Sequence, residues 1–179
     1  MILNLRGTGG SGKSTVGRWL ARRATRDIVV PLGHHLNENK TREKLIGYEL
    51  PGELVVLGPY LKERGGGVEG VPTKEVQRFV TEAATYYRHV FFEGYFTSLS
   101  GTPWVGVAEQ LERERARALP FVVLVLDTPA EVCLTRIQER NGGKPINEEV
   151  QRSLHANLRR SILPILAASP AVDVRWLDH

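Results

Sequence analysis

A glycine-rich segment near the N-terminus constrains the fold of this chain more than any other feature. It runs Gly7-Thr8-Gly9-Gly10-Ser11-Gly12-Lys13-Ser14 and is followed by Thr15. This fits G-x-x-x-x-G-K-[ST], the pattern of loops that bind nucleoside triphosphates. Glycines let the backbone turn tightly, so that successive N–H groups can point at phosphate oxygens. The Lys13 ammonium can reach the β- and γ-phosphates, and the Ser14 hydroxyl can hold a magnesium ion.

The flanking sequence supplies the strand and the helix that such a loop requires. Residues 2–5 predict a short strand. Apolar residues at helical spacing follow the loop and predict the buried face of a helix: Val16, Trp19, Leu20 and Ala24. We therefore expect residues 7–15, called the phosphate loop below, to bind the phosphates of ATP at the positive end of that helix. Three arginines spaced by four residues are expected on its solvated face rather than against a nucleic acid: Arg18, Arg22 and Arg26.

Length and composition agree with a single compact domain spanning residues 1–179. No apolar run is long enough to cross a bilayer, and no signal peptide precedes the first strand. Cys133 is the only cysteine, which excludes an internal disulfide and fits the reducing cytoplasm. Its apolar spacing places it in the core. The net charge of +4 is compatible with polyanionic substrates.

Strands and helices are expected to alternate along the whole chain. Further strands are predicted at residues 28–32, 54–57, 90–92, 121–126 and 172–177. Helices are predicted at residues 74–88, around 104–111, and from 150 to 162, where Pro164 kinks or ends the last one. Continuous apolar strands that alternate with helices indicate a parallel sheet covered on both faces. The predicted fold class is α/β: a three-layer P-loop NTPase sandwich with a mostly parallel sheet of five or six strands.

The remaining stretches are expected to be irregular loops, of the kind that meets the substrate in such folds: residues 33–53, 58–73, 94–103 and 141–147. Two of these loops interleave cations with rings, as a nucleic-acid groove does: Lys40, Arg42, Lys44, Lys62 and Arg64, with Tyr48 and Tyr60. The alternative is that the tyrosines pack in the core and the cations are only solvated.

Two acidic residues stand at the ends of predicted strands. Glu93 follows the apolar residues 90–92, where it can hold magnesium or take a proton from an attacking hydroxyl. A structural acid paired with an arginine is the alternative, and the apolar neighbourhood favours the functional interpretation. Asp127 ends the next strand, but Asp-Thr-Pro also makes a good turn into a helix, so we expect a structural role for it.

Arg136 and Arg140 lie one helical turn apart, directly before a glycine loop. Guanidinium groups in such a place can close on the transferring phosphoryl group and spread its charge while water is excluded. We expect residues 136–147 to form an arginine-bearing lid, with a solvated helix face as the alternative. Arg159 or Arg160 on the next helix could also point at phosphate.

At this level of detail the chain resembles the P-loop kinases of the nucleoside and nucleotide kinase group, whose "RxxxR" lid is similar to "TRIQER" here. The stretches "VVLGPYLKERGGGVEG", "VFFEGYFTS" and "LDTPAEVCLTRIQER" are more particular. They are similar to small phage kinases that phosphorylate the hydroxymethyl group of 5-hydroxymethyluracil in DNA during DNA hypermodification. That group's glycine-rich segment tends to end in Asp, whereas Glu69 stands here and adds a methylene.

The resemblance implies ATP as donor, Mg²⁺ held near Ser14 and Glu93, and catalysis by Lys13, Glu93, Arg136 and Arg140. It implies DNA containing 5-hydroxymethyluracil as acceptor and the host cytoplasm as location. Candidates for binding the acceptor are Tyr60, Arg64 and Glu69. Two other functions remain open: a kinase of a free nucleoside, nucleotide or other small molecule, and a regulatory NTPase. The paired lid arginines argue against the second.

Overall fold

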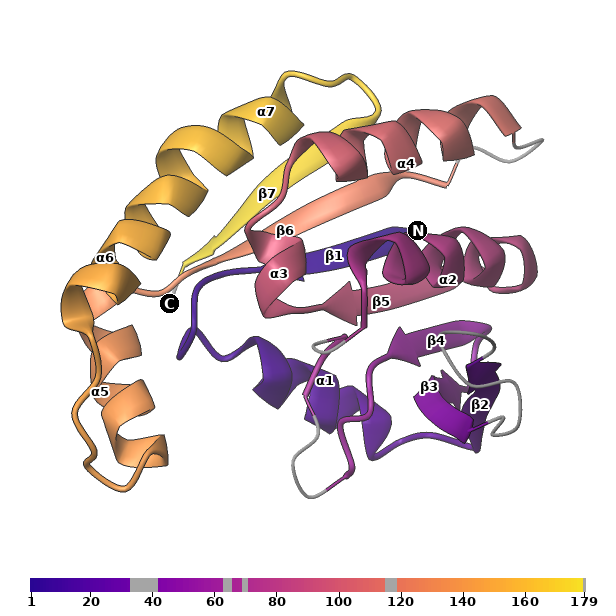
Figure 1. Cartoon of the computed structure of the whole chain (residues 1–179). Coiled ribbons are helices and arrows are strands. Elements are labelled where there is room, and N and C mark those ends of the chain that lie inside the picture. The colour runs from indigo at the N-terminus through magenta and orange to yellow at the C-terminus, as the bar shows by residue number, and fades with distance from the viewer. Residues whose placement is uncertain (33–41, 63–65, 69–70, 115–118, 179) are drawn as a thin grey trace.

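The computed structural model describes residues 1–32, 42–62, 66–68, 71–114 and 119–178. These residues form a seven-stranded sheet in the order β2-β3-β4-β5-β1-β6-β7 (Figure 1). The strands are β1 (Ile2–Arg6), β2 (Arg26–Leu32), β3 (Arg42–Leu50), β4 (Leu54–Leu57), β5 (His89–Glu93), β6 (Phe121–Asp127) and β7 (Val172–Asp178). The five strands from β4 to β7 in this order run parallel, which confirms the predicted mostly parallel sheet.

The number of strands differs from the prediction, because β3 lies in a stretch that we expected to be irregular. It pairs antiparallel with β2 on one side and with β4 on the other, so β2 joins the sheet as half of a hairpin. The sequence of β3, REKLIGYEL, mixes charges and a glycine with apolar residues. It lacks a continuous apolar run, and backbone pairing with two neighbours makes it a strand.

The helices in the middle of the chain agree with the predicted ones, and the last predicted helix consists of three consecutive helical segments. They are α1 (Lys13–Ala21), α2 (Thr73–Tyr86), α3 (Tyr95–Ser98), α4 (Thr102–Glu114), α5 (Ala130–Arg140), α6 (Glu148–Asn157), the π-helix η1 (Leu158–Ile162) and α7 (Leu163–Ala167). The stretch 94–103, expected to be irregular, contains α3 and the start of α4. No helix in the described ranges is both long enough and apolar enough to cross a membrane.

Pro164 does not end the last helical stretch but lies in the first turn of α7, directly after a π-helical turn. The N–H of Leu163 donates to the carbonyl of Leu158, five residues earlier, so a wide π turn directly precedes the proline. A proline inside an α-helix clashes with the carbonyl four residues before it. The wider turn relieves that clash, and α6, η1 and α7 follow one another as a single curved rod (Figure 1).

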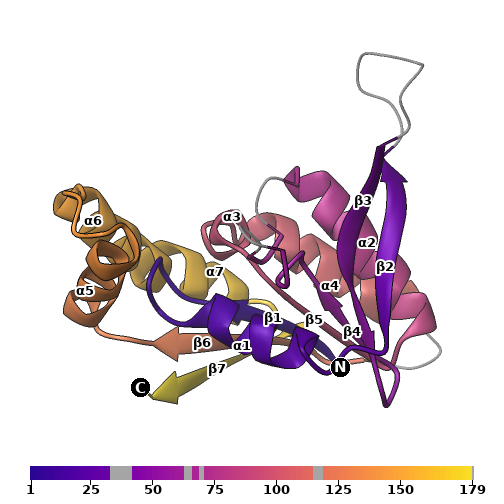
Figure 2. The ribbon, with the colours of Figure 1, turned by 90° about the horizontal axis from the view of Figure 1, so that it is seen from below.

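Helices lie on both faces of the sheet, as the predicted three-layer α/β fold requires. Apolar side chains of α2, α4, η1 and α7 form one core with β1, β4, β5, β6 and β7. On the opposite face α1 packs over a second core that includes Leu5, Tyr48 and Phe91 (Figure 2). Cys133 on α5 is buried as expected.

The first helix buries only part of the predicted face, because Leu20 and Ala24 pack against the second core but Val16 and Trp19 do not. Its buried residues are Lys13, Gly17 and Ala21, whereas Val16 and Trp19 are 37% and 55% exposed. Small residues on the buried side let the helix lie close to the sheet. The predicted row of three arginines is also interrupted, because the helix ends at Ala21 and Arg26 begins β2.

Candidate active site

The phosphate loop connects the end of β1 to the start of α1. The Lys13 ammonium lies inside the curve of the loop and donates to the carbonyls of Gly7 at 2.8 Å and Thr8 at 2.9 Å. Gly10 has a φ of 79° and passes so close to α5 that an added Cβ would lie 2.3 Å from the carbonyl oxygen of Cys133. The loop is therefore held against α5 by a contact that only glycine allows.

Glu93 lies beside the phosphate loop because β5 and β1 are neighbours in the sheet and Glu93 pairs in register with Leu5. Its side chain is fully buried. The Ser14 hydroxyl donates to Glu93 Oε1 at 3.0 Å, so the two predicted magnesium ligands touch. A hydroxyl and a carboxylate oxygen are ligands of the kind that Mg²⁺ takes from a protein beside phosphate oxygens, and these two residues fit such an ion.

A cleft of about 1250 Å³ opens over the phosphate loop. Its walls include most of the phosphate loop together with Arg136 and Arg140 of α5. Arg136 Nη1 also donates to the carbonyl of Gly10 at 3.3 Å. The tertiary structure thus brings together the predicted donor-binding loop and both predicted lid arginines. A second hollow, of about 500 Å³, lies between α2 and α4, away from the phosphate loop.

The segment around Gly67 covers the carboxylate of Glu93 from the other side of the cleft. The N–H of Val68 donates to the carbonyl of Glu93 at 2.9 Å. A Cβ on Gly67 would lie 2.1 Å from that carbonyl oxygen and 2.6 Å from Glu93 Oε1. Gly66 and Gly67 both line the cleft. Backbone therefore packs directly on the acid, a role that the glycine-rich sequence did not disclose.

Tyr95 of α3 and Arg18 of α1 are among the cleft-lining side chains that we did not predict as site residues. The signal for Tyr95 was its position two residues after Glu93 in the segment Glu93-Gly94-Tyr95. Arg18 was expected only on a solvated helix face. It is exposed, as expected, and it also lines the cleft.

A buried arginine ties the end of β1 to the segment between α3 and α4. Arg6 donates to Asn4 Oδ1 at 2.6 Å and to the carbonyl of Ser100 at 2.6 Å. Burial lowers the pKa of Arg6 to about 9, since a charge is costly away from water. The contact joins the strand that leads into the phosphate loop to the segment that follows Tyr95.

Comparison with known proteins identifies the family of this chain. The family described as 5-hmdU DNA kinase matches residues 1–162. This chain belongs to the 5-hmdU DNA kinase family. The match confirms the predicted resemblance and the prediction of a phosphotransferase.

Individual relatives carry the same description. The 5-hmdU DNA kinase of Pseudomonas phage M6 is 33% identical over 97% of this chain and 90% of its own length. The 5-hmdU DNA kinase 1 of Salmonella phage ViI is 30% identical over 82% of this chain, which spans 62% of that longer protein. Among solved structures, a deoxyadenosine kinase from M. mycoides with bound dATP is similar at 15% identity and a TM-score of 0.41, covering 99% of this chain and 91% of the other.

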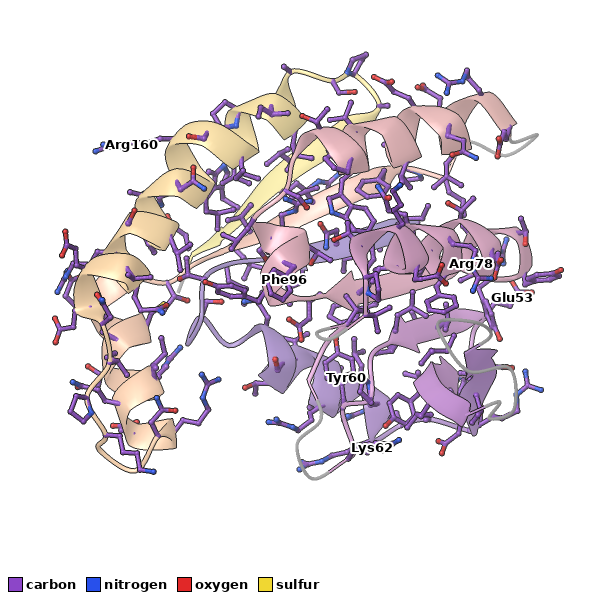
Figure 3. All side chains as sticks on the ribbon, in the orientation of Figure 1. Glu53, Tyr60, Lys62, Arg78, Phe96 and Arg160 are labelled. Carbon is purple, nitrogen blue, oxygen red and sulfur yellow. The ribbon has the colours of Figure 1, made fainter. Side chains whose placement is uncertain are left out.

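Of the three candidate acceptor-binding residues in this kinase, Tyr60 is the one that the structure describes. It is 1% exposed and packs against Gly17 on the buried side of α1, so it belongs to the core and not to the cleft wall. Figure 3 shows it beside α1. Tyr48 is also buried, and its hydroxyl accepts the N–H of Leu61 at 3.0 Å. The packing alternative is therefore correct for both tyrosines. Arg64 and Glu69 lie outside the described residues.

The remaining acidic and basic candidates pair with one another or point outward. Asp127 forms an ion pair with Arg159, which supports the structural role expected for this acid. The Arg159 guanidinium also lies 5.3 Å from the centre of the Trp176 ring. Arg160 points away from the body of the molecule (Figure 3). Neither arginine lines the cleft.

Proposed function

We propose that this kinase transfers the γ-phosphate of ATP to the 5-hydroxymethyl group of 5-hydroxymethyluracil in DNA. Membership of the 5-hmdU DNA kinase family supports this acceptor. The observation that carries the proposal is that Glu93 lies directly behind the phosphate loop that lines the cleft, with Ser14 Oγ 3.0 Å from the Glu93 carboxylate. A donor site and a proton acceptor for an alcohol thus lie side by side.

The donor would bind along the phosphate loop. In this proposal residues 7–15 bind the ATP phosphates, with Lys13 meeting the charge of the β- and γ-phosphates. Ser14 and Glu93 would hold Mg²⁺, which neutralises phosphate charge when bound. Arg136 and Arg140 line the same cleft and would act as the lid arginines. Their two positive charges match the charge that spreads over the phosphoryl oxygens during transfer.

The chemical step would be an in-line displacement at the γ-phosphorus. The hydroxymethyl oxygen forms a bond to the γ-phosphorus while the bond from that phosphorus to the β,γ-bridging oxygen breaks, and ADP leaves. The hydroxyl proton passes to the carboxylate of Glu93. Burial of Glu93 keeps water from competing with the acceptor at this point.

The acceptor base must leave its stack before the cleft can enclose it. A base inside a duplex has to be flipped out or presented in a single strand. Tyr95, on the cleft wall directly after Glu93 and Gly94, offers a ring for the base to stack on. Gly66 and Gly67 line the cleft and Gly67 packs on Glu93, so glycine at both positions keeps the cleft wall beside the acid free of side chains.

The test is phosphate transfer from labelled ATP to a panel of acceptors: free nucleosides, nucleotides, plain DNA, and DNA carrying 5-hydroxymethyluracil. We expect label only in the DNA that carries the modified base. Efficient transfer to the free nucleoside with none to the polymer would overturn the proposal in favour of a small-molecule kinase. ATP hydrolysis with no transfer to any acceptor would favour a regulatory NTPase.

A further inference from the structure

The exposed face of α1 combines cations with an exposed ring. It comprises Thr15, Val16, Arg18, Trp19, Arg22 and Arg23, all of them exposed and opposite the buried Lys13, Gly17 and Ala21. We call these six residues the α1 face. In Figure 2 the helix lies in front of the sheet. A tryptophan left in water forgoes the burial that normally stabilises it. An exposed tryptophan such as Trp19 is therefore unusual on a helix face that contacts only solvent.

The α1 face differs in charge from helices α2, α4, α5 and α6. From Lys13 to Arg23 the chain has four basic residues and no acidic one. By contrast, α2, α4, α5 and α6 each carry at least two glutamates. Arginines on α2 and α6 are accordingly paired with these or neighbouring acids, as Arg78 is with Glu75 and Glu82. The α1 face therefore presents positive charge that its own helix does not neutralise.

The α1 face is continuous with the cleft. Thr15, Val16 and Arg18 line the cleft, Trp19 continues from them along the helix, and Arg22 and Arg23 follow directly after its end. At 1.5 Å per residue, the end of the helix at Ala21 lies about 9 Å beyond Thr15 along the helix axis. That length corresponds to about two to three nucleotides at the 3.4 Å spacing of one DNA strand. A strand whose modified base entered the cleft would reach this face with its neighbouring nucleotides.

Trp19 is held in a fixed arrangement. The Arg23 guanidinium carbon lies 3.7 Å from the centre of the Trp19 ring, and Arg23 Nη1 donates to the Trp19 carbonyl at 2.6 Å. The guanidinium covers one face of the ring, yet Trp19 remains 55% exposed. A ring that is already oriented loses less side-chain entropy on binding than a free one. Its uncovered surface suits stacking with an unpaired base.

We propose that the α1 face binds the DNA strand that carries the acceptor base, with Trp19 stacking on a flanking nucleotide and Arg22 and Arg23 contacting phosphates. This inference rests on the proposed function and adds where the polymer lies. It also explains how such an enzyme would distinguish a polymer from a nucleoside, because the cleft holds one modified base while the α1 face holds its neighbours.

The experiment compares three forms of the full-length protein: wild type, Trp19→Ala, and Arg22→Gln with Arg23→Gln. The matched control replaces two exposed arginines away from the cleft, Arg113→Gln with Arg160→Gln, and changes the net charge by the same amount. The probe is a fluorescently labelled single-stranded oligonucleotide with one 5-hydroxymethyluracil. Binding is measured by anisotropy over a range of salt concentrations, and the KM for ATP is measured alongside.

We expect Trp19→Ala to weaken binding about fivefold or more, since stacking on one base is worth about 1–3 kcal/mol. Loss of two phosphate contacts should lower the slope of log K against log salt by about 1.4, at about 0.7 per contact for single strands. The control pair and the KM for ATP should change little. Trp19→Phe, which keeps a ring, should bind closer to wild type than Trp19→Ala.

The outcomes separate this inference from the proposed function. If wild-type protein transfers no phosphate to DNA carrying 5-hydroxymethyluracil, the proposed function fails. If wild type transfers phosphate but the α1-face variants bind DNA like the control pair, the α1 face is not the DNA site and the inference is overturned. A changed oligomeric state in those variants with unchanged DNA binding would assign the face to a second copy of the chain, which also overturns it.

Discussion

Glu93 combines burial with hydrogen bonding to a residue of the phosphate loop. Its carboxylate accepts the Ser14 hydroxyl at 3.0 Å, and the backbone at Gly67 packs against it. A carboxylate in such a place has few orientations, so its oxygens are aimed before any substrate arrives. At the scale of single residues, the predicted chemistry therefore depends on the charge of the Glu93 side chain and on the lack of a side chain at Gly67.

Glu93→Gln tests the charge. The amide keeps the shape and can still accept from Ser14, but it cannot take a proton. We expect kcat to fall by about 10²- to 10⁴-fold, the usual contribution of a general base, while the Kd for ATP changes little. Single-turnover transfer and ATP binding measure the two quantities. An unchanged kcat would move the proton acceptor to another carboxylate, with Glu69 as the candidate, since Asp127 pairs with Arg159.

Gly67→Ala tests the close approach. The added methyl would overlap the carbonyl and carboxylate of Glu93, so we expect a loss of about 1–3 kcal/mol in stability and a lower kcat/KM for the acceptor. The matched control is Gly106→Ala, where an added Cβ meets nothing within 4 Å. In the helix α4 this control should stabilise the protein by about 0.5–1 kcal/mol. Equal changes in stability and in kcat/KM for the two variants would contradict close packing of Gly67 on Glu93.

At the scale of elements, one aromatic cluster holds α4 on the sheet. Trp104 is fully buried, and its ring centre lies 4.8 Å from that of Phe92 on β5. Its indole N–H donates to Ser100 Oγ at 3.1 Å, beside the Ser100 carbonyl that receives Arg6. Packing of α4 thus reaches the segment between α3 and α4, next to the cleft.

Trp104→Ala should lower the free energy of unfolding by about 3–5 kcal/mol, because it removes a large buried ring and leaves a cavity. Urea denaturation followed by circular dichroism measures the change. Trp19→Ala is the matched comparison, since that tryptophan is 55% exposed and should cost less than about 1 kcal/mol. Similar losses in the two variants would show that burial of Trp104 does not dominate its contribution.

At the scale of the whole molecule, 24 basic residues exceed 20 acidic ones by four, and their distribution matters more than the sum. Lys13, Arg18, Arg136 and Arg140 line the cleft, whereas Glu93 is the acid behind it and is fully buried. The same region that would bind ATP phosphates thus presents positive charge to a polyanion. Such charge acts over distance and is screened by salt.

The proposed DNA acceptor predicts a steep salt dependence. Contacts to several phosphates release counterions, so the KM for DNA carrying 5-hydroxymethyluracil should rise strongly between 50 and 200 mM salt, with a slope of about 0.7 per phosphate contact on a single strand. The KM for ATP, measured at the same salt concentrations, shows how much of the effect belongs to the donor site. A KM for DNA that does not change with salt would contradict binding through the backbone.

Local sequence determined the parts of this protein that depend on short-range pattern. The phosphate loop between a strand and a helix, the apolar parallel strands and the acid after β5 could each be read within a few residues, because turn geometry and side-chain periodicity are local properties. The family resemblance added the reaction. The same local pattern was only partly right for α1, where Leu20 packs against the second core but Val16 and Trp19 lie on the exposed side.

Contacts between distant segments decided the rest. Strand β3 exists because β2 and β4 pair with it, and Tyr60 is a core residue because α1 lies over it. Gly67 meets Glu93 across 26 positions of sequence, a contact that no spacing rule discloses. Burial of a side chain depends on which element covers it, and that follows from how the whole chain packs. For this reason the sequence by itself determined the phosphate loop and its chemistry, whereas only the tertiary structure decided which surface continues from the cleft.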